Sequence, residues 1–79
     1  MESSLRQRLE DLATALHLRR EDAPTAVEAH DEVVNALNDD SFDGLGDRLE
    51  RYAIGLETDH PALVALIRNV VDELSALGI

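Results

Sequence analysis

The chain has no cysteine among its 79 residues. A disulfide framework, a thiolate site for zinc or an iron–sulfur cluster, and catalysis by a thiol are therefore excluded. A chain of this length is one small domain, residues 1–79, and a domain of this size buries only about 60% of its unfolded surface. Its stability must come from apolar packing or from association with another subunit.

Lysine is also absent, because all seven basic residues are arginine, and seventeen acidic residues bring the formal net charge to −10. Such a field repels nucleic-acid phosphates and anionic membrane surfaces, so we expect no nucleic-acid partner and no membrane partner. We hypothesise a salt-accumulating, halophilic source, since salt at about 1 M would screen the self-repulsion of the chain. A high-GC genome that encodes arginine in place of lysine is the alternative.

Long apolar runs are missing as well. The longest, from Ala62 to Ile67, is far shorter than the roughly 20 residues that a membrane-spanning helix needs. The N-terminal residues MESSLRQRLED lack the apolar core of a signal peptide. We therefore expect a cytoplasmic protein.

Apolar residues recur at alternating spacings of four and three, which is typical of helices with one buried face. The pattern predicts an all-α fold of four short amphipathic helices, over residues 3–20, 24–38, 43–57 and 61–77, in an antiparallel bundle. Pro24 and Pro61 suit the first turns of two of these helices. The predicted buried positions are Leu5, Leu9, Leu12 and Leu16, then Val27, His30, Val34 and Leu37, then Leu45, Leu49, Tyr52 and Leu56, and finally Leu63, Ile67, Val70, Leu74 and Leu77.

The fourth predicted helix is apolar around much of its circumference, because Val64, Leu66 and Val71 lie off its main stripe. Such a helix is either central in the fold or covered by a second subunit. We predict a homodimer formed through this helix and part of the first, and an unidentified protein is the other possible partner. The interface residues that we expect are Val64, Ile67, Val71 and Leu74.

The C-terminal segment ETDHPALVALIRNVVDELSALGI resembles the end of the family catalogued as domain of unknown function 4404, and LRQRLEDLATAL is similar to the first helix of that family. The resemblance implies a small, wholly helical protein without an assigned activity, and it brings no catalytic residue. From the residues alone, Gly78 can take the left-handed conformation of a Schellman motif that ends the helix. The family-like motif comprises Glu57, His60, Pro61, Gly78 and Ile79.

Residues 39–50, DDSFDGLGDRLE, match the calcium-loop pattern D-x-[DN]-x-[DN]-G-x5-E except at Ser41. Gly46 stands where such loops carry an aliphatic residue, and the flanking helices are out of phase. Leu45 also belongs to a predicted helical stripe, whereas a calcium ligand at this position would be non-helical. We favour an interpretation without metal, in which Ser41 or Asp43 caps the third helix. The calcium ligands would be Asp39, Ser41, Asp43, the Leu45 carbonyl, Asp47 through water, and Glu50.

Three histidines remain to be assigned. His30 could be a metal ligand or a pH switch, but a histidine at the rim of an apolar stripe is more often packed and satisfied by a carboxylate. His17 and His60 fall on other helices, and no H-E-x-x-H motif is present. We expect His60 to cap the helix that Pro61 opens.

No serine, histidine and aspartate arrangement of known spacing and no glycine-rich phosphate cradle appears in the sequence. We therefore expect no enzyme and no cofactor. The sequence favours a non-enzymatic, homo-oligomeric interaction or assembly module. A calcium-binding protein that uses the loop at 39–50 is one alternative, and a small metal-dependent enzyme is another.

The halophile hypothesis makes a prediction about folding. We expect helicity, measured by circular dichroism, to rise from dilute buffer to molar salt, because the ions screen repulsion among the acidic side chains. Full helicity in dilute buffer would contradict the hypothesis.

Overall fold

The structure is a computed structural model that describes the backbone of residues 2–79 and the side chains of residues 4–79. The four helices are α1 (Glu2–Leu18), α2 (Pro24–Asp39), α3 (Leu45–Leu56) and α4 (Pro61–Ala76), and residues 2–79 contain no strand. The prediction of four helices is confirmed, with every boundary within two residues of the expected one. The molecule is compact and measures 32 × 20 × 18 Å.

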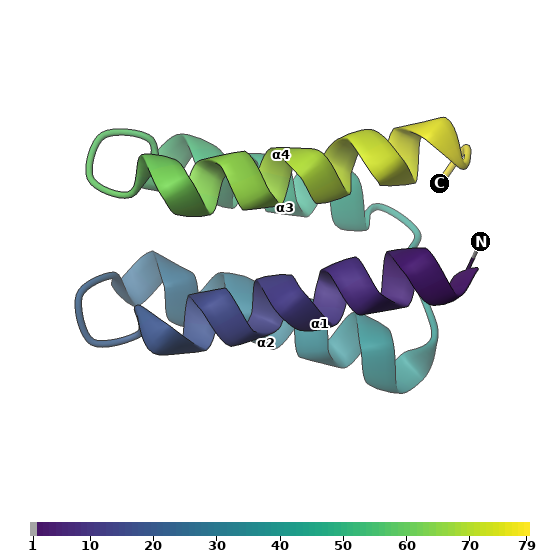
Figure 1. The fold of residues 1–79 in the computed structure, drawn as a ribbon, viewed down its shortest axis with the longest axis horizontal. Coiled ribbons are helices and arrows are strands. Elements are labelled where there is room, and N and C mark those ends of the chain that lie inside the picture. Colours follow the sequence, from purple (N-terminus) through teal and green to yellow (C-terminus); the bar gives the residue numbers. More distant parts are fainter. Residues whose placement is uncertain (1) are drawn as a thin grey trace.

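The helices surround one core. Figure 1 shows α1 and α4 on the near side, with α2 and α3 behind them, and both ends of the chain at the same end of the molecule. The turns that join α1 to α2 and α3 to α4 lie at the opposite end. Helix α1 contacts α2 and α4, and helix α3 contacts the same two helices. Each helix therefore presents one face to two neighbours.

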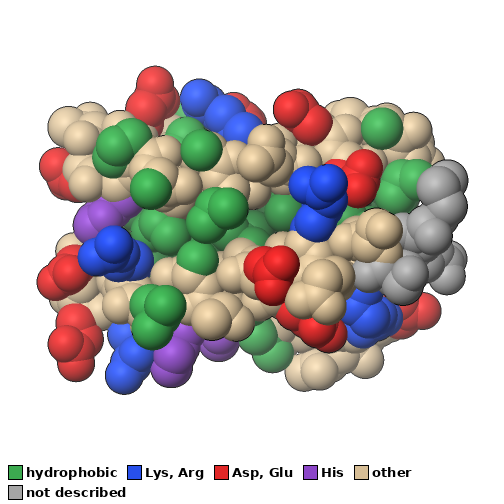
Figure 2. Space-filling view, in the orientation of Figure 1, with side chains coloured by type: hydrophobic (Ala, Val, Ile, Leu, Met, Phe, Trp, Pro, Cys, Tyr) green, Lys and Arg blue, Asp and Glu red, His purple; other side chains and the backbone are tan. Residues whose placement is uncertain are grey.

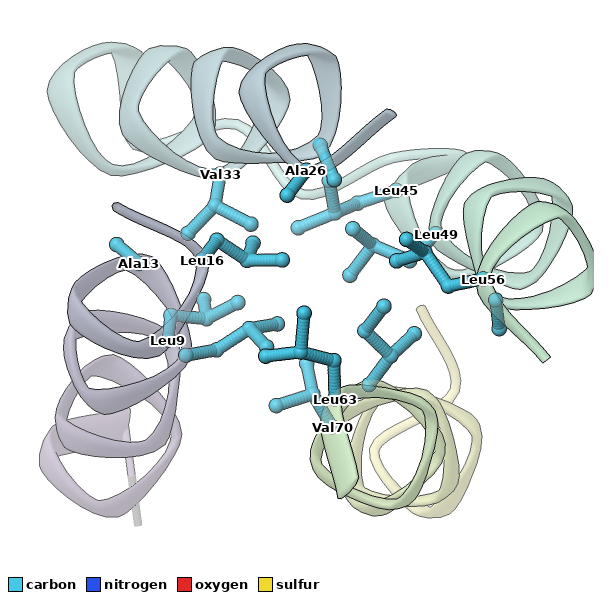
Figure 3. Close-up of a cluster of buried hydrophobic side chains, with 14 of the residues drawn as sticks. Leu9, Ala13, Leu16, Ala26, Val33, Leu45, Leu49, Leu56, Leu63 and Val70 are labelled. Carbon is cyan, nitrogen blue, oxygen red and sulfur yellow. The ribbon is translucent and has the colours of Figure 1, made fainter. Parts of the chain in front are cut away.

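The core consists only of aliphatic side chains. All four leucines predicted for α1 are buried, as are Leu63, Ile67, Val70 and Leu74 of α4, so these stripes are confirmed. In Figure 3, Leu9 and Leu16 of α1 point toward the same centre as Leu49 of α3 and Leu63 of α4. No polar or charged side chain is buried among the residues that the structure describes. Polar chemistry is confined to the surface.

The buried face of α2 differs from the predicted one. Val27 is 41% exposed and His30 is only partly buried, whereas Val34 and Leu37 pack at the margin of the core. The core positions are instead Ala26, Ala29, Val33 and Ala36. The sequence pattern gave weight to the large apolar residues, but the small alanines let the helix backbone approach its neighbours closely. The predicted stripe was therefore wrong by about one residue.

Two smaller differences concern α3 and the end of α4. Tyr52 of α3 is only partly buried, and the neighbouring Ala53 occupies the core instead. Leu77 lies just beyond α4 and is 38% exposed. Helix α3 turns the small Ala53 inward in place of Tyr52, whereas α4 ends at Ala76, before Leu77 can reach the core.

Three of the loops and helix ends depend on residues with positive φ, which are Asp40, Gly44 and Gly78. Gly78 has φ +77° after α4, its N–H donates to the Ser75 carbonyl at 3.1 Å, and the Ile79 N–H donates to Leu74 at 3.0 Å. This is the predicted Schellman motif. After α2, Asp40 takes φ 52°, and the Ser41 N–H donates to the Ala36 carbonyl at 3.1 Å.

Each helix-to-helix contact is crossed by one arginine side chain. Guanidinium nitrogens lie 2.9 to 3.8 Å from carboxylate oxygens, and the side chains of these pairs are between 30% and 77% exposed. Exposed pairs of this kind stabilise a fold by only about 0–1 kcal/mol each. We call them the four arginine bridges: Arg6–Asp40 between α1 and the end of α2, Arg8–Glu73 between α1 and α4, Arg48–Glu32 between α3 and α2, and Arg68 with Glu50 and Glu57 between α4 and α3.

Two glycines provide a matched test of the backbone. Gly55 lies inside α3, where an added Cβ would meet Thr25 Cγ2 at an ordinary 3.6 Å, whereas Gly44 has φ +72° and a Cβ there would lie 3.1 Å from Arg48 Nη1. Gly55→Ala should raise the free energy of unfolding by about 0.5–1 kcal/mol, because alanine loses less backbone entropy. Gly44→Ala should lower it by about 1–2 kcal/mol. Urea unfolding measures both, and shifts in the same direction would contradict the assigned backbone conformations.

Candidate functional site

An apolar groove lies on the surface between α1 and α4. Its larger hollow, of about 610 Å³, lies at the end that carries the two turns, and its smaller hollow, of about 130 Å³, continues it along the helices. Leu66 lines both hollows. Figure 2 shows hydrophobic side chains gathered along this boundary. We call this surface, lined by Ala15, Leu18, Leu63, Leu66, Leu12 and Val70, the α1/α4 groove.

Charged side chains stand at both ends of the α1/α4 groove. Arg19 and Asp59 line the larger hollow, and Arg8 and Asp11 line the smaller one. Arg8 is already engaged, because its Nε lies 3.2 Å from Glu73 Oε1. Each end therefore offers one acidic and one basic group beside an apolar floor.

Three of the four residues predicted for a dimer interface instead lie in the core of the single chain. Val64, Ile67 and Leu74 are 6%, 0% and 1% exposed, so these side chains are not available to a second subunit. Val71 is partly buried at the margin of the core. Among the large hydrophobic residues of α4, Leu66 is exposed, at 39%. The sequence correctly found α4 unusually apolar, but it did not show which side of the helix stays outside.

Residues 39–50 are divided between two helices and a short loop. Asp39 ends α2, and Leu45 begins α3 with a fully buried side chain. The Leu45 carbonyl therefore lies within a helix, whereas the calcium loop needs it as a free ligand. Asp47 and Glu50 also belong to α3. Within residues 4–79, no three histidine, aspartate or glutamate side chains are grouped so that they could hold a metal ion.

Three arginine side chains from outside or within this segment contact its residues. Arg6 Nη2 donates to Asp40 Oδ1 at 2.9 Å, and Arg48 Nη1 donates to the Asp43 carbonyl at 3.3 Å. Glu50 lies 3.4 Å from Arg68. The carboxylates of Asp40 and Glu50 thus have guanidinium partners, and the loop is a connection between helices held by these contacts.

The predicted side-chain caps are not formed. Gly44 is the N-cap of α3 and makes no side-chain hydrogen bond, so neither Ser41 nor Asp43 has the expected role. His60 does occupy the N-cap position of α4, and Pro61 begins the helix, but the imidazole forms no capping hydrogen bond. Glu57 caps the C-terminus of α3 through its backbone, and its carboxylate lies 3.8 Å from Arg68. The His60 ring instead lines the larger hollow of the groove.

The remaining two histidines come together. His17 is in the last turn of α1, His30 is on α2, and their ring centroids are 5.6 Å apart with an interplanar angle of 41°. Sequence analysis placed them on separate helices and missed the pair. The available signal was that they lie on either side of the short turn between two adjacent helices.

A polar cluster lies where α2 meets α3. Arg48 Nε donates to Glu32 Oε2 at 2.9 Å, and Tyr52 stands beside this pair. Partial burial raises the pKa of the Tyr52 phenol above its usual value of 10.0. The negative charges of Glu32 and Glu28 raise it further, while Arg48 acts in the opposite direction.

The phenol gives a direct test of this environment, because Tyr52 is the single tyrosine and the chain has no tryptophan. Tyrosinate absorbance should titrate above pH 10.0 in the folded protein and return to about 10.0 in denaturant. Because the pKa of the Tyr52 phenol is raised in the folded protein, the neutral phenol contributes to the free energy of unfolding. This contribution is fully present below pH 10.0 and is lost as the pH rises through the pKa of the folded protein.

Two variants sharpen this measurement. Tyr52→Phe should remove this part of the alkaline loss of stability, and Glu32→Gln should move the tyrosinate midpoint back toward 10.0. Equal midpoints in the folded and denatured protein would contradict the assigned burial.

Comparison with known proteins finds no matching family model, no matching curated protein and no matching solved structure. The resemblance to domain of unknown function 4404 therefore stays a prediction. No helix described by the structure is both long enough and apolar enough to cross a membrane. The two candidate binding sites on the surface are the α1/α4 groove and the pair formed by His17 and His30.

Proposed function

We propose that the protein is a non-catalytic interaction module that binds a second copy of itself through the α1/α4 groove. The supporting observation is the apolar floor of the groove together with two exposed leucines beside it. Leu18 is 73% exposed and Leu66 is 39% exposed. Large apolar side chains that stay in contact with water around a hollow are typical of interaction surfaces.

The proposal includes an antiparallel bundle of the four helices. Turns at one end and both chain ends at the other support this arrangement, and so do the contacts of each helix with two neighbours. In such a bundle α1 and α4, the first and last helices, lie side by side and present a long shared boundary. A second copy of the same shape could pack two further helices along that boundary.

The charges at the ends of the groove favour a two-fold symmetric pairing. In such a pairing, any contact between two different residues occurs twice. If the grooves meet in opposite directions, Leu66 lies near the two-fold axis against its counterpart. Arg19, just beyond α1, then faces Asp11 on α1 of the second copy, and the symmetry repeats this contact at the other end of the groove. The arrangement places opposite charges together at both ends of one apolar contact.

Net charge sets the conditions for this association. Two chains that each carry −10 repel one another, and salt at about 1 M reduces the Debye length to about 3 Å. We therefore expect the dimer to form best at high salt. The cytoplasm of a salt-accumulating organism is the proposed setting, supported by the acidic and lysine-free composition.

Light scattering after gel filtration in molar salt tests the dimer. The wild-type protein should elute with the mass of two chains, whereas Leu66→Glu should weaken association at least tenfold, because it places a carboxylate at an apolar contact. Ile54→Glu is the matched control, since Ile54 is 62% exposed on α3 and lies outside the groove. A monomeric wild-type protein, or equal effects of the two substitutions, would contradict the proposal.

A charge reversal tests the orientation. Arg19→Asp and Asp11→Arg should each weaken the dimer, and the double variant should recover most of the loss, because the opposed charges are restored in exchanged positions. Circular dichroism of each variant checks that the helices are retained. Additive losses in the double variant would reject the two-fold pairing while leaving association through the groove intact.

A further inference from the structure

His17 and His30 line a hollow that is separate from the α1/α4 groove. The hollow is open, has a volume of about 350 Å³ and is lined by Ala13, Thr14 and the two imidazoles. His17 comes from α1 and His30 from α2, so the pair spans the contact between two helices. His17 is exposed and His30 is partly buried, which leaves both rings accessible to a dissolved ion.

We propose that His17 and His30 form a two-histidine site for a divalent transition-metal ion such as Zn²⁺. Neutral imidazole is a common ligand of these ions. Two rings bound to one tetrahedral ion, at about 2.0–2.1 Å from each nitrogen, have centres roughly 5–6 Å apart. The 5.6 Å between these centroids fits that separation.

The relative orientation of the two rings excludes face-to-face stacking. The planes are tilted by 41°, so the imidazoles are not stacked face to face. The Asp31 carboxylate lies 3.7 Å from His30 Nδ1, which is an electrostatic contact longer than a hydrogen bond. A proton on Nδ1 is favoured on the side of this carboxylate, which leaves the lone pair of Nε2 for the ion.

Some charged groups around the histidine pair favour a bound cation and others oppose it. The Arg20 guanidinium lies near His17, because its Nη1 donates to the His17 carbonyl at 2.8 Å, and this positive charge opposes a nearby cation. Asp31 on the other side favours a cation, as does the net charge of −10 on the whole chain. The attraction is therefore greatest on the α2 side of the hollow.

The pair supplies two ligands, since no third histidine or carboxylate is grouped with them among the described residues. Water completes the coordination. Imidazole nitrogens favour zinc, nickel and copper, whereas calcium and magnesium prefer oxygen ligands. The site should therefore distinguish Zn²⁺ from Ca²⁺, which the acidic surface alone would not do.

A zinc titration of the full chain, followed by NMR at neutral pH in molar sodium chloride, tests the proposal. Saturable shifts at both imidazoles, with one ion per chain, are expected, and excess Ca²⁺ should not displace them. His17→Ala and His30→Ala should each lower the zinc affinity at least tenfold. His60→Ala is the matched control and should leave it unchanged, because His60 lines the α1/α4 groove instead.

A second measurement separates metal binding from damage to the fold. An ion held between α1 and α2 binds only the folded protein, so zinc should raise the thermal midpoint of the wild type and of His60→Ala. It should not raise the midpoint of the other two variants, whose helicity is checked by circular dichroism. Zinc affinity that is equal in all four proteins, or lost equally to Ca²⁺, would overturn the proposal and assign the ion to the acidic surface.

Discussion

Burial of aliphatic side chains between four helices is the interaction on which the rest of this structure depends. The four buried leucines of α1 pack against the alanine-rich face of α2 on one side and the large apolar residues of α4 on the other, and no polar side chain is buried among the described residues. Leu→Ala substitutions in such cores typically lower the free energy of unfolding by about 2–5 kcal/mol. That exceeds the contribution of any single exposed ion pair on the surface.

The small buried residues of α2 also affect which side chains meet on the surface. Ala26, Ala29 and Ala36 are almost completely buried, which lets the α2 backbone lie close to its neighbours. A close α2 allows side chains of two different helices to meet across their contact, as His17 and His30 do. The same packing keeps the larger apolar residue Val27 outside, at 41% exposure.

Much of the fold could be predicted from the sequence because helix periodicity and helix ends depend on local properties. Pro24 and Pro61 begin helices as expected, and Gly78 ends α4 with the expected hydrogen bonds. The buried face of α2 could not be predicted in the same way. Alanine is compatible with core and surface alike, so the pattern followed Val27 and His30 instead.

The candidate sites depended on tertiary contacts that no local pattern contains. The sequence identified α4 as unusually apolar but assigned Val64 and Ile67 to an interface, although both are buried within the chain. Residues 39–50 matched a metal motif at every defined position except Ser41, yet Leu45 starts a helix there. The partners of Asp40 and Glu50 are Arg6 and Arg68, which lie far away in the sequence.

The four arginine bridges bear on the handedness of the fold, which is the direction in which the four helices follow one another around the core. An aliphatic core is tolerant of alternative packing, so it discriminates weakly between a left-turning and a right-turning order of the same four helices. Reversing the turn would present the other flank of each helix to its neighbour and separate the bridged side chains. Ion pairs that add little to stability can in this way select one of two mirror-related topologies.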